Sequence, residues 1–586
     1  MTSPPPQAAA ARRALLLIVL ALAPLWLVGI FDRGLWTPDE PREADIAWRM
    51  SLQADRTLPQ LAGAPFLEKP PLSYWVAGGA IAAFGDSPAA ARGPNLLYAA
   101  ITALAVGALA LAMELPAMPA VIAALVAASA LTAYRVLIWL APDASLLAGC
   151  AVALLGAWLG LQAPAGGRKA GAYALMHLGA ALGFMAKSAP GWLVPGLALL
   201  TLIVWERRWR ELRRWELYAG LALQALIIGP WVIAVARSAR GAEALTALFW
   251  HNVVGRFTQL SSPAALDYTS GHHNAPGKYL LELPVYLLPW TVVAAAALVR
   301  AWTRMREAGA RGTAWRFALS ASIPFLVLLS VAATARDIYA APALLPFGLL
   351  AGLWAEDARR LPRNGDRVAT LGTVVLVAVM AGALALALAV LAAAGSGAPI
   401  LYLSAALGVI LLAAAALAFA VRAQRGGDPP RSLAWSYAAY AAALCLAARL
   451  ILPVVDRWQD LPALAARIHA DTASQSLALL DPDETTIAML DHGLATPFTI
   501  LTSAATARGV VAAWFAAHGP AARVLVLLPG HAGGALTEFL ARLRPLPAPG
   551  DGVAATLTAA GAAALVARYE LPQGRRYALL APPAAH

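Results

Sequence analysis

Long apolar stretches dominate this sequence and restrict what it can fold into. A helix of about 20 residues crosses the roughly 30 Å hydrocarbon core of a bilayer, and we count about 13 candidates. They lie near residues 14–30, 92–112, 117–137, 141–162, 171–187, 189–205, 216–236, 279–302, 315–333, 338–355, 367–392, 399–421 and 432–453. Because lipid offers the backbone no hydrogen bonds, stretches of this length predict a bundle of transmembrane helices.

Composition agrees with a lipid environment. Of the 586 residues, 60% are hydrophobic and only 13% are charged, which is far too apolar for a soluble chain of this length. The first stretch follows Arg12 and Arg13 as a signal peptide would, but no small-residue cleavage site follows it, so we expect a membrane anchor. Cys150 and Cys445 lie inside apolar stretches, where we expect them to pack between helices rather than form a disulfide.

The net charge of +12 reflects membrane topology rather than nucleic-acid binding, because the basic residues cluster in short loops. With a cytoplasmic N-terminus, every strongly basic short loop falls on the cytoplasmic side. These loops hold Arg168 and Lys169; Arg207, Arg208, Arg210, Arg213 and Arg214; Arg300, Arg304, Arg306 and Arg311; Arg359, Arg360, Arg363 and Arg367; and Arg422, Arg425 and Arg431. We therefore expect a multi-pass inner-membrane protein whose odd number of spans places the C-terminus in the periplasm.

Three regions remain on the periplasmic side: residues 31–91, residues 237–278 and the chain after 453. The last alternates strand-length apolar runs (Ser476–Leu480, Val524–Leu528) with helix-like stretches (Leu461–Ile468, Gly534–Leu543). We therefore predict a transmembrane domain over 1–453, with 31–91 and 237–278 as periplasmic loops, and a small α/β domain over 454–586.

The first periplasmic loop opens with an acidic pair, Asp39 and Glu40, between Pro38 and Pro41. Ile46, Ala47 and Met50 then recur at amphipathic spacing, which predicts an interfacial helix along the outer membrane face. Asp39 has two readings that spacing alone leaves open. It can cap this helix beside water, or the pair can supply a base that activates a hydroxyl group.

Lys69 follows Glu68 and precedes two prolines and an aromatic run, Tyr74-Trp75, typical of headgroup depth. It is either an interfacial lysine that reaches for water or a rigidly held ammonium that binds phosphate.

Two further charges, Asp143 and Lys187, lie at the outer ends of spans. Charges at such places often mark cavities, although Asp143 after Pro142 can also cap a helix. The segment Arg336-Asp337-Ile338-Tyr339 completes the outer face.

Histidines 251, 272 and 273 in the second loop could bind a divalent metal ion together with Glu68. Their spacing does not require one.

Five motifs in this order resemble a known family: Trp-x-Pro-Asp-Glu-x-Arg (Trp36 to Arg42), Glu-Lys-Pro-Pro-Leu-x-Tyr-Trp (Glu68 to Trp75), Phe-x-x-Lys (Phe184 to Lys187), His-Asn-x-x-x-Arg-Phe (His251 to Phe257) and Pro-Trp-Thr (Pro289 to Thr291). Together they resemble the bacterial lipid A aminoarabinose transferases and the wider protein mannosyltransferase-like, GT-C superfamily. Each motif alone is weak, and the ordered set is specific.

The resemblance implies a GT-C-type membrane bundle in which a sugar passes from undecaprenyl phosphate to a periplasmic acceptor. Asp39 matches the essential acid of that family and Asp143 its second important aspartate. Residues matched to the carrier phosphate are Lys69, Arg256 and Tyr339, and a metal-binding pair is matched by Glu68 and His251. From the same motifs we assign Glu40 a catalytic role and assign Arg42 and Lys187 to carrier or substrate binding. These enzymes usually carry tyrosine where this chain has Glu43, which leaves the donor sugar open.

The expected partners are an undecaprenyl-phosphate-linked sugar such as aminoarabinose, lipid A or another glycolipid or glycan acceptor, and membrane lipids, with the protein acting as a monomer. Departure of the carrier phosphate leaves negative charge that Lys69 and Arg256 can stabilise. Alternatives are transfer to protein Ser/Thr or to a surface glycan, a lipid or solute transporter, and a membrane scaffold with a periplasmic sensor domain. A transporter should place its ionisable residues near the membrane midplane, whereas here they gather at outer ends and loops.

Overall fold

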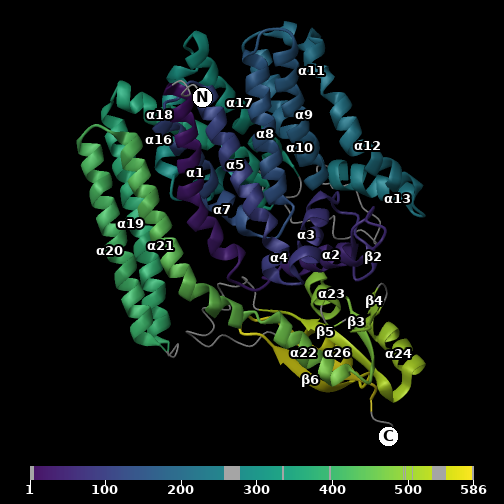
Figure 1. Ribbon diagram of the computed structural model, residues 1–586. Coiled ribbons are helices and arrows are strands. Elements are labelled where there is room, and N and C mark those ends of the chain that lie inside the picture. Colours follow the sequence, from purple (N-terminus) through teal and green to yellow (C-terminus); the bar gives the residue numbers. More distant parts are fainter. Residues whose placement is uncertain are drawn as a thin grey trace.

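The protein consists of a large helical bundle and a smaller unit built on a β-sheet (Figure 1). A computed structural model describes residues 6–255, 277–332, 336–394, 398–492, 494, 496–503, 506–530 and 550–583. The bundle comprises the chain as far as residue 458, and the sheet follows it.

Every predicted apolar stretch is helical. The helices are α1 (Pro6–Ile30), α5 (Pro94–Ala112), α6 and α7 (Ala117–Ser129, Leu131–Ile138), α8 (Asp143–Gln162), α9 (Gly167–Lys187), α10 (Pro190–Trp205), α11 and α12 (Trp215–Ala219, Leu221–Arg237), α15 and α16 (Lys278–Tyr286, Thr291–Arg304), α17 (Gly309–Val331), α18 (Ala341–Arg360), α19 (Asn364–Ala393), α20 (Pro399–Arg425) and α21 (Pro429–Trp458). The chain is thus a multi-pass membrane protein.

Not every one of these helices is long enough to cross a bilayer by itself. Within the described ranges, nine helices are long and apolar enough to cross a bilayer, or eleven if two bent pairs each count as one span. The pairs are α6 with α7, bent by 67°, and α15 with α16, bent by 120°. They meet where the Leu131 N–H donates to the Leu288 carbonyl over 2.8 Å. Because α10 is a shorter apolar helix, thirteen crossings stay a prediction.

Helices α8 and α9 pack with their backbones almost in contact. A Cβ atom added at Gly149 would lie 2.7 Å from the Gly183 nitrogen, and one at Gly156 would lie 2.2 Å from the Met176 nitrogen. Small residues allow such close approach in membranes, where van der Waals packing rather than the hydrophobic effect drives helix association. This packing brings the start of α8 beside the end of α9, where two of the predicted site residues lie.

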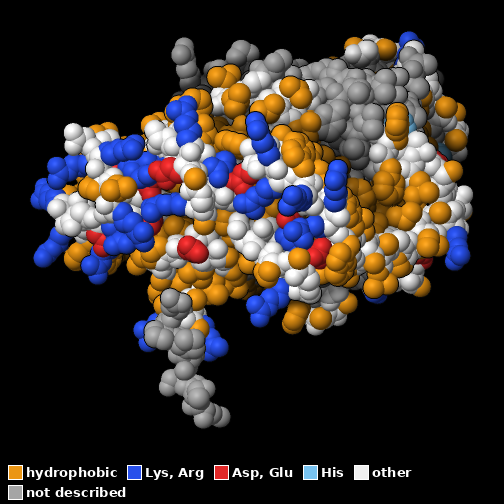
Figure 2. Space-filling view, turned by 90° about the horizontal axis from the view of Figure 1, so that it is seen from above, with side chains coloured by type: hydrophobic (Ala, Val, Ile, Leu, Met, Phe, Trp, Pro, Cys, Tyr) orange, Lys and Arg blue, Asp and Glu red, His pale blue; other side chains and the backbone are white. Residues whose placement is uncertain are grey.

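The basic loops lie together at the end of the bundle opposite the sheet (Figure 1). Seen from above, that end is covered by many Lys and Arg side chains with Asp and Glu scattered among them (Figure 2). Beneath the surface, Arg300 at this end also pairs with an acid: its Nη2 donates to Asp366 over 2.5 Å. The segregation of charge predicted from the sequence is therefore present in three dimensions.

The unit after residue 458 is a five-stranded mixed sheet in the order β4-β3-β5-β7-β6. Its strands are β3 (Ser476–Leu480), β4 (Thr499–Leu501), β5 (Ala522–Leu528), β6 (Ala564–Glu570) and β7 (Arg576–Ala581). Strand β3 runs parallel to β4 and β5, while β7 is antiparallel to β5 and β6. Both predicted strands are present, and the predicted helix over Gly534–Leu543 lies outside the described residues.

Helices cover both faces of this sheet. Leu477 and Leu479 of β3 belong to an apolar cluster with α22 (Leu461–Thr472) and α23 (Glu484–Asp491). The alternate residues of β3 pack instead with α24 (Ala507–His518) and α26 (Gly552–Ala559). This alternation is the period of two that a strand imposes on its side chains.

The first loop lies between the bundle and the sheet (Figure 1). It contains α2 (Glu40–Leu52), the short strands β1 (Gln60–Leu61) and β2 (Ala64–Pro65), α3 (Leu72–Phe84) and α4 (Pro88–Arg92). The helix predicted from residue 41 onwards is present as α2, but its charged residues Arg42, Glu43 and Asp45 are buried as well. The amphipathic pattern predicts a solvated charged face. In the structure α23 covers α2, and the charges form ion pairs instead.

Candidate functional site

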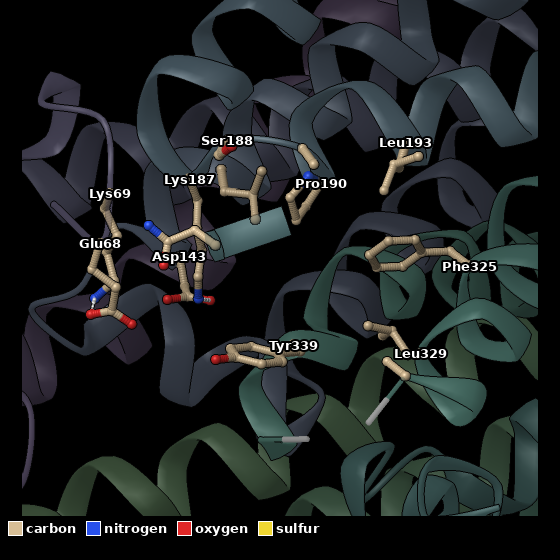
Figure 3. A pocket seen from close by; sticks show the side chains of 14 residues that line it. Glu68, Lys69, Asp143, Lys187, Ser188, Pro190, Leu193, Phe325, Leu329 and Tyr339 are labelled. Carbon is tan, nitrogen blue, oxygen red and sulfur yellow. Dashed lines mark hydrogen bonds and ion pairs between the residues drawn. The ribbon is translucent and has the colours of Figure 1, made fainter. Parts of the chain in front are cut away.

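A cavity with about 820 Å³ of space, part of it open to the surroundings, lies beside the first loop. Its polar end is lined by Glu68, Lys69, Asp143, Lys187 and Tyr339. The other end is lined by the apolar side chains Leu193, Phe325 and Leu329 (Figure 3). Five residues that the sequence predicts for the site thus meet around one space, although they come from distant parts of the chain.

Asp143 and Lys187 form an ion pair at the polar end. The Lys187 Nζ lies 2.5 Å from Asp143 Oδ1 and 4.6 Å from the centre of the Tyr339 ring, a distance at which cation–π attraction operates. The pair exists because α8 begins at Asp143, α9 ends at Lys187 and the two helices pack closely. The carboxylate of Asp143 is therefore engaged by an ammonium group that faces the cavity.

Lys69 lines the same polar end and is buried. Its Nζ donates to Glu43 Oε1 over 2.8 Å, and Glu68 Oε2 lies 3.6 Å away. Burial lowers the pKa of Lys69, but the charges of Glu43 and Glu68 outweigh that effect and raise it above the ordinary value. Lys69 is thus a charged, rigidly held ammonium rather than a lysine that extends into water.

Asp39 occupies the N-cap position of α2, yet its side chain makes no capping hydrogen bond. The buried carboxylate accepts hydrogen bonds from both terminal nitrogens of Arg336, over 3.1 and 2.6 Å, and from Arg42 Nη2 over 3.3 Å. Burial raises the pKa of Asp39, but the charge of Arg42 and the hydrogen bond and charge of Arg336 lower it to about 2. The capping alternative is set aside, since the carboxylate faces two arginines and stays ionised at neutral pH.

Arg336 is a residue that the sequence did not assign to the site. The sequence places the segment 336–339 at the outer face, and this placement is the available signal for Arg336. The pairing with Asp39 carries no local signal, because the two residues lie 297 positions apart. The Tyr339 N–H donates to the Arg336 carbonyl over 3.0 Å, so one short turn supplies both an Asp39 partner and a wall of the cavity.

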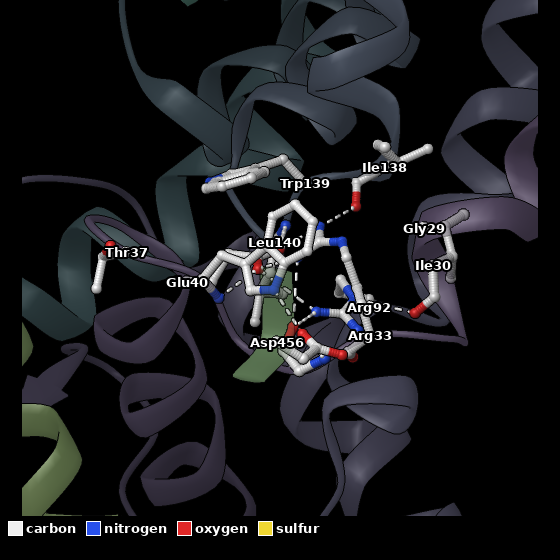
Figure 4. A network of polar contacts seen from close by, with 12 residues as sticks. Gly29, Ile30, Arg33, Thr37, Glu40, Arg92, Ile138, Trp139, Leu140 and Asp456 are labelled. Atoms are coloured by element: carbon white, nitrogen blue, oxygen red, sulfur yellow. Dashed lines mark hydrogen bonds and ion pairs between the residues drawn. The ribbon is translucent and has the colours of Figure 1, made fainter. Parts of the chain in front are cut away.

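Glu40 lies in a different environment from Asp39 (Figure 4). Its fully buried carboxylate accepts hydrogen bonds from Arg33 and Arg92 and from the N–H groups of Trp36 and Leu140. Like Asp39, it is not among the residues that line the cavity. Successive side chains of a helix point about 100° apart, so adjacent acidic residues face different surroundings. These contacts hold the loop in place, and the catalytic role of Glu40 stays a prediction.

Arg42 is buried and engages three carboxylates. Its Nη2 donates to Glu43 over 2.6 Å and to Asp39, while its Nη1 pairs with Glu484 of α23. Arg42 does not line the cavity and holds Asp39 through its contacts, while its predicted role in substrate binding stays a prediction. Glu484 carries no sequence signal of such a role, because it lies 442 positions away.

The second loop is described only in part. His251 lies in the helical segment η2 (Thr246–Gly255) and is half-buried. Its neighbour Asn252 lines the cavity and donates to the Leu67 carbonyl over 2.6 Å, next to Glu68. Arg256, His272 and His273 lie outside the described residues. Among the residues that are described, no group of three or more His, Cys, Asp or Glu could hold a metal ion, so a metal at Glu68 and His251 stays a prediction.

Comparison with known proteins places these features in a family context. The family described as dolichyl-phosphate-mannose-protein mannosyltransferase matches residues 68–233. An undecaprenyl phosphate-alpha-4-amino-4-deoxy-L-arabinose arabinosyl transferase of Edwardsiella ictaluri is 30% identical over 360 residues, which cover 61% of this chain and 62% of that protein. The protein of the same name from Pseudomonas aeruginosa strain LESB58 is also 30% identical, over 364 residues. The match therefore covers about three fifths of the length of these relatives.

Solved structures extend the likeness to nearly the whole chain. The crystal structure of ArnT from Cupriavidus metallidurans bound to undecaprenyl phosphate has a TM-score of 0.67 at 19% identity, covering 97% of this chain and 98% of that one. The apo structure of the same protein has the same TM-score at 20% identity. The chain thus shares the fold of this transferase and, as its motifs predict, resembles the aminoarabinose transferase-like GT-C glycosyltransferases.

Proposed function

We propose that this protein transfers a sugar, aminoarabinose or a similar one, from undecaprenyl phosphate to lipid A or another acceptor that faces the periplasm. The single observation that carries the proposal is the division of the cavity into a polar end with two lysines and an apolar end. A polyprenyl phosphate is divided in the same way, into an anionic head and a hydrocarbon tail. The solved structure of similar fold that carries undecaprenyl phosphate supports this match.

The polar end suits departure of the carrier phosphate. When the bond between sugar and phosphate breaks, negative charge grows on the phosphate oxygen, and a preorganised ammonium in a partly desolvated cavity stabilises that charge. Lys69 and Lys187 are placed for this at the polar end of the cavity (Figure 3), where Tyr339 also lines it. Arg256 remains a proposed third cation.

Asp39 fits an electrostatic role better than a proton-transfer role. A general base works best when its pKa is near the working pH, whereas the pKa of Asp39 is about 2. An ionised carboxylate can orient the acceptor and stabilise the positive charge that develops on the sugar ring. This role is sufficient when the acceptor is already an anionic phosphate, as on lipid A.

A divalent ion at Glu68 and His251 remains part of the proposal. Carboxylate and imidazole are suitable ligands, and such an ion would add positive charge near the phosphate. The described residues hold no group of three or more such ligands, and the steps above use the lysines alone.

The orientation proposed is the one that the basic loops predict, with the N-terminus in the cytoplasm and the sheet unit in the periplasm. The cavity then opens on the periplasmic side, beside the loop that carries Asp39 and Lys69.

Transfer to protein is the second candidate, because the family matched over residues 68–233 is described as a protein mannosyltransferase. Purified protein in detergent, supplied with an undecaprenyl-phosphate-linked aminoarabinose donor, should transfer the sugar to lipid A but not to a Ser/Thr-rich peptide. Mass spectrometry of both acceptors decides between the candidates. A second measurement uses the protein reconstituted in vesicles. If neither acceptor gains mass in detergent and the donor moves between the leaflets of these vesicles, the protein is a transporter and the proposal is wrong.

A further inference from the structure

Helix α23 of the sheet unit packs directly on α2, the helix that follows Asp39 (Figure 1). Ala488 of α23 lies in one apolar cluster with Ile46 and Met50 of α2. Two ion pairs flank this contact: Arg42 with Glu484, and Arg49 with Asp491, whose Nε and Oδ2 lie 2.7 Å apart. The sheet unit therefore touches the helix whose N-cap is Asp39, the acid of the proposed function.

The first turn of α23 holds both the backbone and the partner of Asp39. The Thr485 Oγ1 donates to the Pro38 carbonyl over 3.0 Å, immediately before Asp39 in the chain. Glu484 engages Arg42 Nη1, while Arg42 Nη2 reaches Asp39 and Glu43. A guanidinium group is rigid and planar. A carboxylate bound to Nη1 therefore fixes the plane in which Nη2 meets Asp39.

This turn is itself firmly attached to the sheet. Asp483 caps α23 by accepting a hydrogen bond from the Thr486 N–H over 2.9 Å. Arg575 Nη2 donates to the same carboxylate over 2.5 Å, and the hydroxyl groups of Thr486 and Tyr577 lie 3.0 Å apart. Positions held by rigid elements transmit their geometry to what they contact.

We propose that Glu484 is a positioning residue for sugar transfer, and that the sheet unit completes the reaction centre by holding Arg42 and Asp39 through Glu484 and Thr485. The inference rests on the proposed function. It assigns the C-terminal unit a task in the reaction itself, beyond attachment to the membrane domain.

The test compares two carboxylate-to-amide changes on the same helix. Glu484→Gln should lower kcat about 10-fold or more, because small misplacements of reacting groups are costly, with KM for the donor and the melting temperature close to wild type. Asp491→Asn weakens the other ion pair between α23 and α2 and should keep wild-type kcat. Glu484→Asp, which keeps the charge, should restore part of the lost rate.

Amide hydrogen exchange supplies a readout that does not depend on activity. Glu484→Gln should speed exchange in the first turn of α2, where the Glu43 N–H donates to the Asp39 carbonyl over 3.0 Å, and Asp491→Asn should not. The inference is overturned if Glu484→Gln leaves that exchange unchanged, or if both variants lose kcat equally. An inactive wild-type protein would instead contradict the proposed function, and the exchange comparison would still decide the role of Glu484.

Discussion

Asp39 shows how much one side chain depends on its partners. A carboxylate at a helix N-terminus ordinarily caps the helix, but this one turns to Arg336 and Arg42 and leaves the cap unmade. The buried Arg42 and the half-buried Arg336 outweigh the cost of burying the carboxylate and hold its pKa near 2. An acid placed in this way carries negative charge at any pH at which the protein works.

Replacing Asp39 with Asn should remove that charge and preserve the shape of the side chain. We expect transfer to fall roughly 10²-fold or more, the usual cost of removing a preorganised electrostatic group, while the protein still elutes as wild type. Transfer from a polyprenyl-phosphate donor and melting in detergent are the measurements. Near-normal turnover by Asp39→Asn would leave the mechanism without its central residue.

Glu40→Gln is the comparison at the neighbouring residue. It should lower the stability of the protein rather than the rate of transfer by the folded protein. Its carboxylate faces Arg33 and Arg92 in a buried network (Figure 4), and removing one partner of a buried ion pair costs about 3–5 kcal/mol. We expect a clear loss of melting temperature, with residual activity that follows the folded fraction. A stable but inactive Glu40→Gln protein would return Glu40 to the catalytic role predicted from the sequence.

Whole helices also depend on their partners, as the contact between α8 and α9 shows. Their glycines let the backbones approach, and that approach places Lys187 of α9 beside Asp143 of α8. A larger residue at the contact must push the helices apart, and the ion pair lies at the end of the displaced segment.

Gly179→Ala and Gly171→Ala test this packing within α9. A Cβ atom at Gly179 would lie 2.5 Å from the Ala153 nitrogen, whereas one at Gly171 has nothing within 4 Å. We expect Gly179→Ala to destabilise by about 1–3 kcal/mol through overpacking and to reduce transfer. Gly171→Ala should be neutral or slightly stabilising, because alanine favours helix over glycine. Equal melting temperatures for the two variants would contradict the packing argument.

The contact between α2 and α23 should respond to pH through Asp45. Burial and the nearby carboxylate of Asp491 raise the pKa of Asp45 to about 8, although Arg49 and the Ala62 N–H also face it. A pKa raised by folding means that the protonated form stabilises the folded state. That contribution is complete below about pH 4 and is lost as pH rises through 8.

The melting temperature should therefore fall between pH 5.5 and pH 8.5, and Asp45→Asn should reduce the fall. Asn keeps a neutral side chain at both pH values, so thermal scans of the two proteins isolate the contribution of Asp45. The argument fails if the variant shows the same pH dependence as wild type.

Over the whole molecule, the arrangement of charge argues for one orientation in the membrane. The basic loops share one end of the bundle, while the loop with Asp39 and the sheet unit share the other (Figure 1). Because cytoplasmic loops carry an excess of Lys and Arg, the end with the cavity should face the periplasm.

Reporter fusions test this orientation. A reporter after His586 should signal a periplasmic location, and one inserted in the basic loop between α10 and α11 should signal the cytoplasm. A cytoplasmic signal at His586 would remove the argument for a site that faces outward, whatever the enzyme activity.

Local properties of the sequence were sufficient for the predictions that the structure confirms. Whether a stretch is apolar for 20 residues, or whether a loop is basic, depends on neighbouring residues alone. Every apolar stretch is accordingly a helix, and the basic loops gather at one end. The ordered motifs contain Lys69 and Lys187, and the resemblance that they carry also pointed to Asp143 and Tyr339; all four residues line one cavity.

Pairings between distant segments required the tertiary structure. Asp39 meets Arg336, and Arg42 meets Glu484, across hundreds of residues, and no local pattern encodes which charge meets which. The different surroundings of Asp39 and Glu40 have the same origin, because neighbours on a helix face different surroundings. The charged side of α2 is buried where α23 packs against it. A charged face can remain buried only where another segment supplies the opposite charges.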